Sequence, residues 1–147
     1  MTPVDQKIFD FKRGDCFRAC VASIFDLALE DVPNFMADGP DRFDFLVDEF
    51  FDPLGLICLD VNAIDTTDGQ MSQMYVIATG QSPRGTERKH QHSVVWRRGK
   101  MVHDPHPERA GLIGDPETYT LFVVKDPASY YPLAVEQLDD ILESDKK

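Results

Sequence analysis

Residues 15–28 have the sequence DCFRACVASIFDLA. Small or apolar side chains recur in it at spacings of three and four residues, which is typical of the buried face of a helix. Asp15 is a favourable N-cap residue, because its carboxylate can accept hydrogen bonds from the free amides of the first turn. The sequence therefore predicts a helix that begins at Cys16 and ends near Ala28.

The apolar pattern of the remaining chain predicts further helices and a set of strands. A stripe of Phe, Leu and Val side chains predicts a second helix over residues 41–51, which the turn sequence after it ends. Arg98-Gly99 predicts a tight turn between two strands. An acidic amphipathic helix is predicted near the C-terminal end, over residues 133–142. Short apolar runs predict the strands, at residues 56–61, 74–78, 93–96, 100–103 and 118–124.

The order of these elements, with helices first and an antiparallel meander afterwards, indicates an α+β fold. The length of 147 residues fits one domain, which we expect over residues 1–147. Apolar residues make up 42% of the chain and include ten Phe, which is enough for a packed core. Cys20 and Cys58 are expected in that core, because free cysteines are among the most buried residue types.

Composition and charge exclude several classes of protein. The net charge of −11 argues against non-specific binding of nucleic acid and against binding to an anionic membrane surface. The negative charge favours solubility, and the more specific alternative is that it binds a basic partner or substrate. No apolar run approaches the roughly 18 residues of a membrane span, and the N-terminal residues lack the pattern of a signal peptide. The odd count of three cysteines implies no disulfide framework, so we expect a reducing cytoplasm.

Cys16 stands at a position that favours thiol chemistry. The partial positive charge at a helix N-terminus favours the thiolate, and a neighbouring imidazolium adds to this effect. The N–H groups that open a helix have no partner inside it, so the Cys16 amide is available to an oxyanion. One turn of helix thus predicts a nucleophile together with an oxyanion donor.

A histidine must act as the base, and His92 stands at the start of a predicted strand, where a rigid element positions it. Counting outward from the Arg98-Gly99 turn places His92 and Asp104 at nearly opposite positions of the hairpin. Asp104 is therefore predicted to accept from the imidazole and to fix its tautomer. His90 is the alternative base. The remaining two histidines are expected at the surface, and one of them could line the substrate cleft: His103 and His106.

These motifs resemble the papain-like cysteine peptidases, most closely the bacteriocin-processing peptidases associated with ABC exporters. In that branch an acidic residue precedes the nucleophile and a second Cys follows it four residues later, as in Asp15-Cys16-Phe17-Arg18-Ala19-Cys20. The branch also has a His, a short hairpin and Asp-Pro, matched by His92 and by Asp104-Pro105. The resemblance spans about residues 6–105. It implies a papain-like cysteine hydrolase domain whose nucleophile begins a helix packed on an antiparallel sheet.

The chain departs from this family at two positions. Phe17 follows the nucleophile where the family usually has Gly, and Asp10 occupies the place of the oxyanion Gln, about six residues before the Cys. Gln6 lies ten residues before Cys16 and is the only Gln upstream of it. The resemblance implies that Gln6 completes the oxyanion hole, provided that a small insertion in the loop brings its carboxamide to the site.

The sequence thus predicts a hydrolase in which Cys16 attacks a carbonyl, His92 transfers the proton and Asp104 orients His92. A thioester would form without any cofactor. Peptide, isopeptide and small amide bonds all fit, and so does acyl transfer; a peptide or protein substrate is favoured. The alternative is a catalytically degenerate papain-like binding module, an inhibitor or adaptor such as a phage or mobile element could encode. A metal site at the histidines is a third reading, disfavoured because no CxxC pair or HExxH helix accompanies them.

Overall fold

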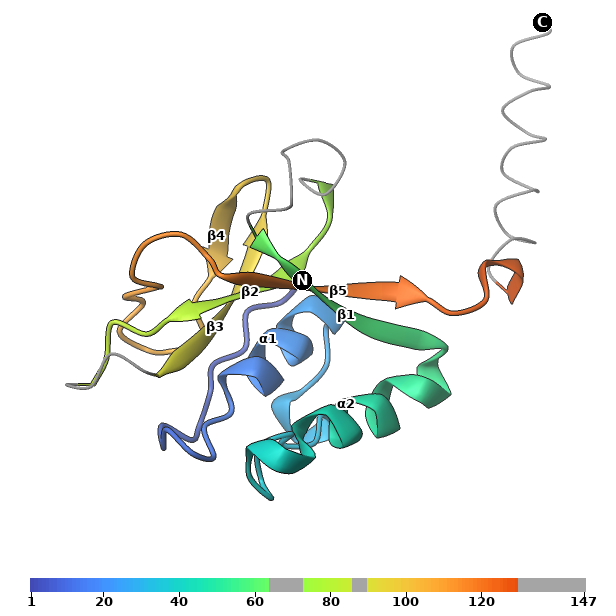
Figure 1. Ribbon diagram of the computed structural model, residues 1–147, viewed down its shortest axis with the longest axis horizontal. Coiled ribbons are helices and arrows are strands. Elements are labelled where there is room, and N and C mark those ends of the chain that lie inside the picture. The colour runs from blue at the N-terminus through green and yellow to red at the C-terminus, as the bar shows by residue number, and fades with distance from the viewer. Residues whose placement is uncertain (64–72, 86–89, 130–147) are drawn as a thin grey trace, which may run out of the picture.

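The computed structural model describes residues 1–63, 73–85 and 90–129, and the predicted helix at 133–142 lies outside them. Two N-terminal helices pack on a five-stranded antiparallel sheet, so the predicted α+β class is confirmed (Figure 1). The helices and strands of the described part are α1 (Cys16–Phe25), α2 (Phe43–Phe51), β1 (Leu56–Asn62), β2 (Val76–Gln81), β3 (Gln91–Arg97), β4 (Lys100–His103) and β5 (Thr118–Val124).

The sheet is not the simple meander that was predicted. Its strand order is β1-β5-β2-β3-β4, so only β2, β3 and β4 follow one another as a meander. β5 returns across the sheet and lies between β1 and β2, with Cys58 opposite Phe122 on one side and Ile77 opposite Thr120 on the other. β1 and β2 are thus not neighbours in the sheet, and the apolar β5 pairs with both of them.

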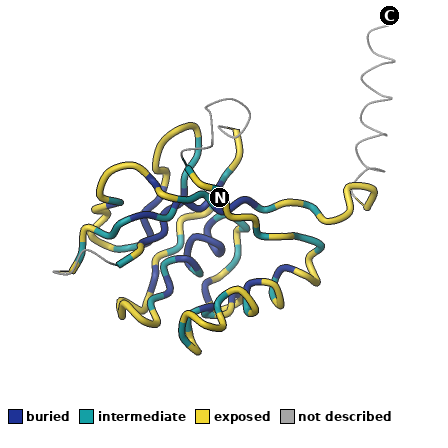
Figure 2. Tube along the Cα trace, in the orientation of Figure 1, coloured by how far each residue is buried: buried dark blue, intermediate teal, exposed yellow. Residues whose placement is uncertain are grey.

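α1 lies against β3 and β2 and carries the most buried segment of the chain, which Figure 2 shows as a continuous dark run. The helix ends at Phe25 and not near Ala28, because Asp26 adopts a left-handed conformation with φ 55°. The N–H of Leu27 then donates to the Ala22 carbonyl at 2.9 Å, a hydrogen bond that satisfies the end of the helix. α1 is therefore fixed firmly at its C-terminal end.

A cluster of aromatic rings fixes α2 against α1 and the sheet. Phe35 is almost completely buried, and its ring lies 5.7 Å from that of Phe17 and 6.5 Å from that of Phe51. Phe51 in turn lies 5.3 Å from Phe122 in β5. Because α1, α2 and β5 all contribute rings to this cluster, the cluster holds the first turn of α1 in a defined place.

Asp15 does not cap α1 as predicted, since its side chain makes no hydrogen bond to the first turn of the helix. Its Oδ1 instead accepts from the backbone N–H groups of Lys7, at 3.0 Å, and Ile8, at 2.8 Å. Asp15 is 1% exposed, and these bonds satisfy its buried Oδ1, while Oδ2 lies 3.6 Å from Nη1 of Arg18 in an ion pair. The aspartate therefore ties the N-terminal segment to the start of α1, a role that depends on contacts between distant residues.

Candidate active site

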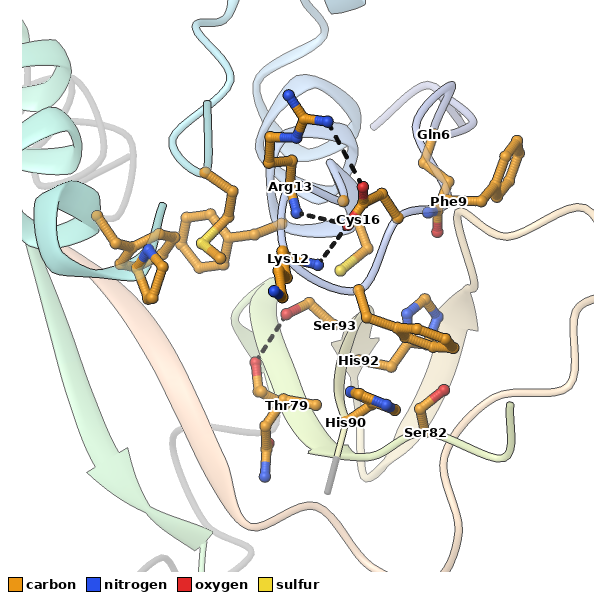
Figure 3. A pocket seen from close by; sticks show the side chains of 18 of the residues that line it. Gln6, Phe9, Lys12, Arg13, Cys16, Thr79, Ser82, His90, His92 and Ser93 are labelled. Atoms are coloured by element: carbon orange, nitrogen blue, oxygen red, sulfur yellow. Dashed lines mark hydrogen bonds and ion pairs between the residues drawn. The ribbon is translucent and has the colours of Figure 1, made fainter. Parts of the chain in front are cut away.

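A cleft of about 1360 Å³ opens at the first turn of α1. Gln6, Cys16 and His92 line this cleft, and Asp104 is buried beside His92. Figure 3 shows Cys16 and His92 facing the same space. The fold thus brings all four of the predicted site residues into one region, although more than 80 residues separate Gln6 from His92 along the chain.

His92 is bonded on both sides of its ring. Its Nε2 lies 2.8 Å from Oδ1 of Asp104, which leaves Nδ1 for the hydrogen bond to the Cys16 side chain. Burial alone would lower the pKa of His92, but the hydrogen bonds to Asp104 and Cys16 raise it to about 9. His92 is therefore an imidazolium at neutral pH. An imidazolium beside a thiol is the arrangement that favours a thiolate.

Asp104 is held as a carboxylate by several donors. Its side chain is completely buried, which alone would raise its pKa, yet the hydrogen bond from His92 and two backbone N–H groups hold the pKa well below its usual range. The N–H of His106 donates to Oδ1 at 2.8 Å, and the N–H of Gly111 donates to Oδ2 at 2.7 Å. Arg84 adds an ion pair, with Nη2 at 3.2 Å from Oδ2. Each of the two carboxylate oxygens of Asp104 therefore has two donors.

The contact between His92 and Asp104 was predicted correctly, but from an incorrect register. An uninterrupted ladder from the Arg98-Gly99 turn would place Asp104 opposite Ser93, on the wrong face of the hairpin. The structure has a β-bulge instead: Trp96 pairs with Met101, and Val95 pairs with His103. Carried one residue further, this shifted register places Asp104 beside Val94 and therefore on the face of His92. The extra residue in β4 thus brings the carboxylate to the imidazole.

Gln6 reaches the cleft because the chain between it and Cys16 forms a tight loop. Asp10 accepts from the backbone N–H groups of Lys12 and Arg13, at 2.6 and 3.3 Å, and so closes a turn. Asp10 therefore stabilises this loop, at the position where the resemblance places a Gln.

The Gln6 side chain is buried and held in one orientation. Its Nε2 donates to the Ile8 carbonyl at 2.9 Å, while the Gln6 backbone N–H donates to the Pro105 carbonyl at 3.0 Å. Its Oε1 is buried without a hydrogen-bond partner in the described part of the chain. The carboxamide N–H that does not bond to Ile8 is a donor available at the cleft.

Two other histidines line the cleft, and each packs on a Phe of the loop before Cys16. His90 stacks on Phe11 with 3.8 Å between ring centroids, and His106 meets Phe9 edge-on at 5.1 Å. The His106 ring lies 6.4 Å from that of His92. The prediction that His106 could line the cleft is confirmed. His90 bonds to neither Cys16 nor Asp104 in any contact of the described residues, so the geometry favours His92 as the base.

His103 was expected at the surface, and this expectation is wrong. Its ring is buried, and Nε2 donates to the Val4 carbonyl at 2.9 Å. The N-terminal segment packs across the end of β4 and covers the ring. Because this contact joins residues 99 positions apart, no local pattern indicates it.

The other two cysteines are unsuited to nucleophilic attack. Cys20 is completely buried, as predicted, and its thiol donates to the Ser93 carbonyl at 3.4 Å. Burial raises the pKa of Cys20 well above its ordinary value and raises that of Cys58 to about 12. Both remain thiols at neutral pH.

Two arginines that the sequence does not indicate as site residues hold Asp104 in place: Arg84 and Arg109. Besides its ion pair with Asp104, Arg84 donates from Nε to Glu108 at 3.1 Å. Arg109 donates to the backbone carbonyl of Asp104 and pairs with Asp5 through Nη2 at 2.8 Å. Isolated arginines in so acidic a chain were the available signal, but nothing in their spacing indicates these partners.

Within the described ranges, no three His, Cys, Asp or Glu side chains are grouped so that they could hold a metal ion. Of the helices in that same part of the chain, none combines the length and apolarity needed to cross a membrane. No protein-family model, curated protein or solved structure matches the chain.

Proposed function

We propose that this chain is a papain-like cysteine hydrolase that cleaves amide-type bonds with a Cys16–His92–Asp104 triad. The observation that carries the proposal is the double bonding of His92, to Cys16 on one side and to the buried Asp104 on the other. Nucleophile, base and orienting carboxylate are linked in the order that thiol hydrolysis requires. Gln6 and the opening N–H of α1 supply the oxyanion donors.

In the first half-reaction, the Cys16 thiolate attacks the substrate carbonyl carbon and the carbonyl oxygen becomes an oxyanion. Hydrogen bonds from the α1 amide and from Gln6 stabilise this charge. The C–N bond then breaks, and His92 gives its proton to the leaving amine. The products are a free amine and a thioester on Cys16.

In the second half-reaction, water attacks the thioester carbon while the neutral His92 takes one of its protons. The C–S bond breaks, a carboxylic acid leaves and the thiolate–imidazolium pair is restored. Throughout the cycle Asp104 keeps the imidazole oriented and does not itself take up a proton. The cycle uses no cofactor.

We favour a peptide or isopeptide bond as the substrate and the reducing cytoplasm as the location, where the three free cysteines would persist. The rival proposal is a degenerate papain-like inhibitor or adaptor that binds but does not turn over. The observation that supports the rival is the Oε1 of Gln6, which is buried without a hydrogen-bond partner among the described residues. A carboxamide that is not satisfied in its present position is less suited to catalysis.

Reaction with p-nitrophenyl acetate separates the two proposals. We expect a burst of p-nitrophenol, the mass of one acetyl group on the peptide that contains Cys16, and then steady release as the thioester hydrolyses. Asp104→Asn should slow the steady phase by about a hundredfold or more. Cys16→Ala, checked for its fold by circular dichroism, should abolish both phases. An acetyl-Cys16 that accumulates without hydrolysis supports the binding module, and a wild-type rate equal to that of Cys16→Ala contradicts the hydrolase.

A further inference from the structure

The cleft has two sides of different chemistry, which meet at Cys16. On one side His92 and His106 lie near Arg84 and Glu108, whose side chains are bonded to each other. The other side is formed where the chain enters α2, and Figure 3 shows α2 and His92 on opposite sides of Cys16. The residues that line this second side include four apolar side chains, Phe17, Met36, Pro40 and Phe43.

The reaction proposed above fixes which part of a substrate meets each side. His92 must reach the leaving amine in order to protonate it, so the leaving group lies on the His92 side. The acyl group, which stays on Cys16 as the thioester, therefore extends toward the α2 side. This step rests on the proposed function.

The α2 side is a rigid apolar wall. Phe17 follows Cys16 directly and is 9% exposed, with its ring 5.0 Å from that of Phe43 and 5.7 Å from that of Phe35. Met36 and Phe43 are half-buried, so part of each side chain faces the cleft. A ring held on two sides by other rings cannot retreat, and the half-buried side chains leave apolar surface uncovered.

Charged side chains of both signs line the cleft around this wall. Asp38 and Asp44 line the cleft beside the apolar side chains, and both are exposed. Neither makes an ion pair with another residue of the described ranges. Lys12 and Arg13 line the same cleft, so these charges do not by themselves reject an anion; an acidic side chain is disfavoured because its carboxylate would lose water against the apolar wall.

We propose that Phe17, Met36, Pro40 and Phe43 form the subsite for the side chain of the acyl group, and that this subsite takes a large aliphatic or aromatic side chain such as Leu or Phe. Phe17, the departure from the small residue expected after the nucleophile, is the floor of the subsite. Burial of the ligand side chain against these residues supplies the selectivity, and the loss of hydration disfavours an acidic side chain.

The test uses chloromethyl ketones of N-acetylated Leu, Phe, Gly and Asp, whose reactive groups are identical. The Cys16 sulfur displaces chloride and a thioether forms, so the labelling rate reports how each side chain is held near Cys16. We expect Leu and Phe to label Cys16 about tenfold faster than Gly, and Asp to be the slowest. Equal rates for Leu and Gly, or a faster rate for Asp, would overturn the proposal.

Variants show whether the selectivity comes from this wall. Met36→Ser and the conservative Phe43→Leu should each reduce the ratio of the Leu rate to the Gly rate by about threefold or more. Met74→Ser changes an exposed methionine outside the cleft and should leave the ratio unchanged. A ratio that does not respond to Met36→Ser and Phe43→Leu would refute the assignment of the subsite.

Two further measurements separate failure of the subsite from failure of the proposed function. Iodoacetamide, which has no acyl side chain, reports the reactivity of Cys16 alone; slow alkylation counts against the hydrolase and not against the wall. Binding is then followed in Cys16→Ala through the methyl resonance of Met36 during titration with N-acetyl-leucinamide. A saturable shift that N-acetyl-glycinamide does not produce supports the subsite, and its absence overturns it.

Discussion

Among single residues, Gln6 is held in one orientation by hydrogen bonds that take no part in the proposed reaction. Its backbone N–H holds it beside Pro105, and its Nε2 is bonded to the Ile8 carbonyl, so the carboxamide cannot turn freely. Asp104 is likewise held by donors other than His92, because two backbone N–H groups and Arg84 bond to its carboxylate. Such supports reduce the reorganisation that a reaction would otherwise require.

The role of Gln6 can be separated from that of Cys16. We predict that Gln6→Ala lowers the rate of acetyl transfer from p-nitrophenyl acetate by about a hundredfold, because one oxyanion donor is lost. The same variant should leave iodoacetamide alkylation of Cys16 unchanged, because that displacement forms no oxyanion. Parallel kinetics with the two reagents check the prediction. If both rates fall together, Gln6 supports the thiol and not the oxyanion.

Among the elements, the β3–β4 hairpin determines the site, because its bulge places Asp104 on the face of His92. Insertion of one Ala between Val102 and His103 lengthens β4 by a further residue and should move Asp104 from beside Val94 to beside Ser93. We then predict that Asp104 moves to the other face and that the pKa of His92 falls from about 9, because the hydrogen bond to Asp104, the larger of the two that raise it, is lost.

NMR titration of the His92 ring measures this change. Val102→Ala is the matched control, since it keeps the length of β4 and should keep the raised pKa of His92. An insertion variant that is folded and whose His92 still titrates near 9 would show that the register of β4 is not what places Asp104.

The same elements show what the sequence can and cannot predict. The bounds of β4 and β5, and the start of α1 at Cys16, follow from local apolar patterns and turn residues. β2 was placed too early, at 74–78, because its polar end, Gly80 and Gln81, is a strand only through pairing with His92 and Gln91. The bulge, the return of β5 and the contacts of Arg84 all join residues far apart in the sequence. No local pattern carries that information.

At the scale of the whole molecule, the proton on His92 contributes to stability in a defined range of pH. The pKa of His92 is raised from 6.5 to about 9 on folding, so the folded state binds the proton more tightly than the unfolded state. The stabilisation is complete below pH 6.5, where both states are protonated. It is lost as the pH rises from 6.5 through 9, because the unfolded chain releases the proton first. The shift corresponds to roughly 3 kcal/mol.

We therefore predict that the free energy of unfolding of the wild type, relative to that of His92→Gln, decreases between pH 6.5 and pH 9. The substitution removes the titrating group, so other pH-dependent terms shared by both proteins cancel. Urea unfolding at half-unit steps of pH measures the difference. A difference that is constant across this range, or that grows with pH, is inconsistent with a proton held by Asp104 and Cys16.

The central claim is that Cys16 is an activated thiol and that His92 and Asp104 activate it. Its most direct test is alkylation of the native protein by iodoacetamide at pH 6, with the modified cysteines counted by mass spectrometry of their peptides. We expect Cys16 to be alkylated faster than Cys20 and Cys58, and we expect His92→Ala and Asp104→Asn to remove this advantage. Alkylation of Cys16 no faster than that of the other two cysteines would contradict it.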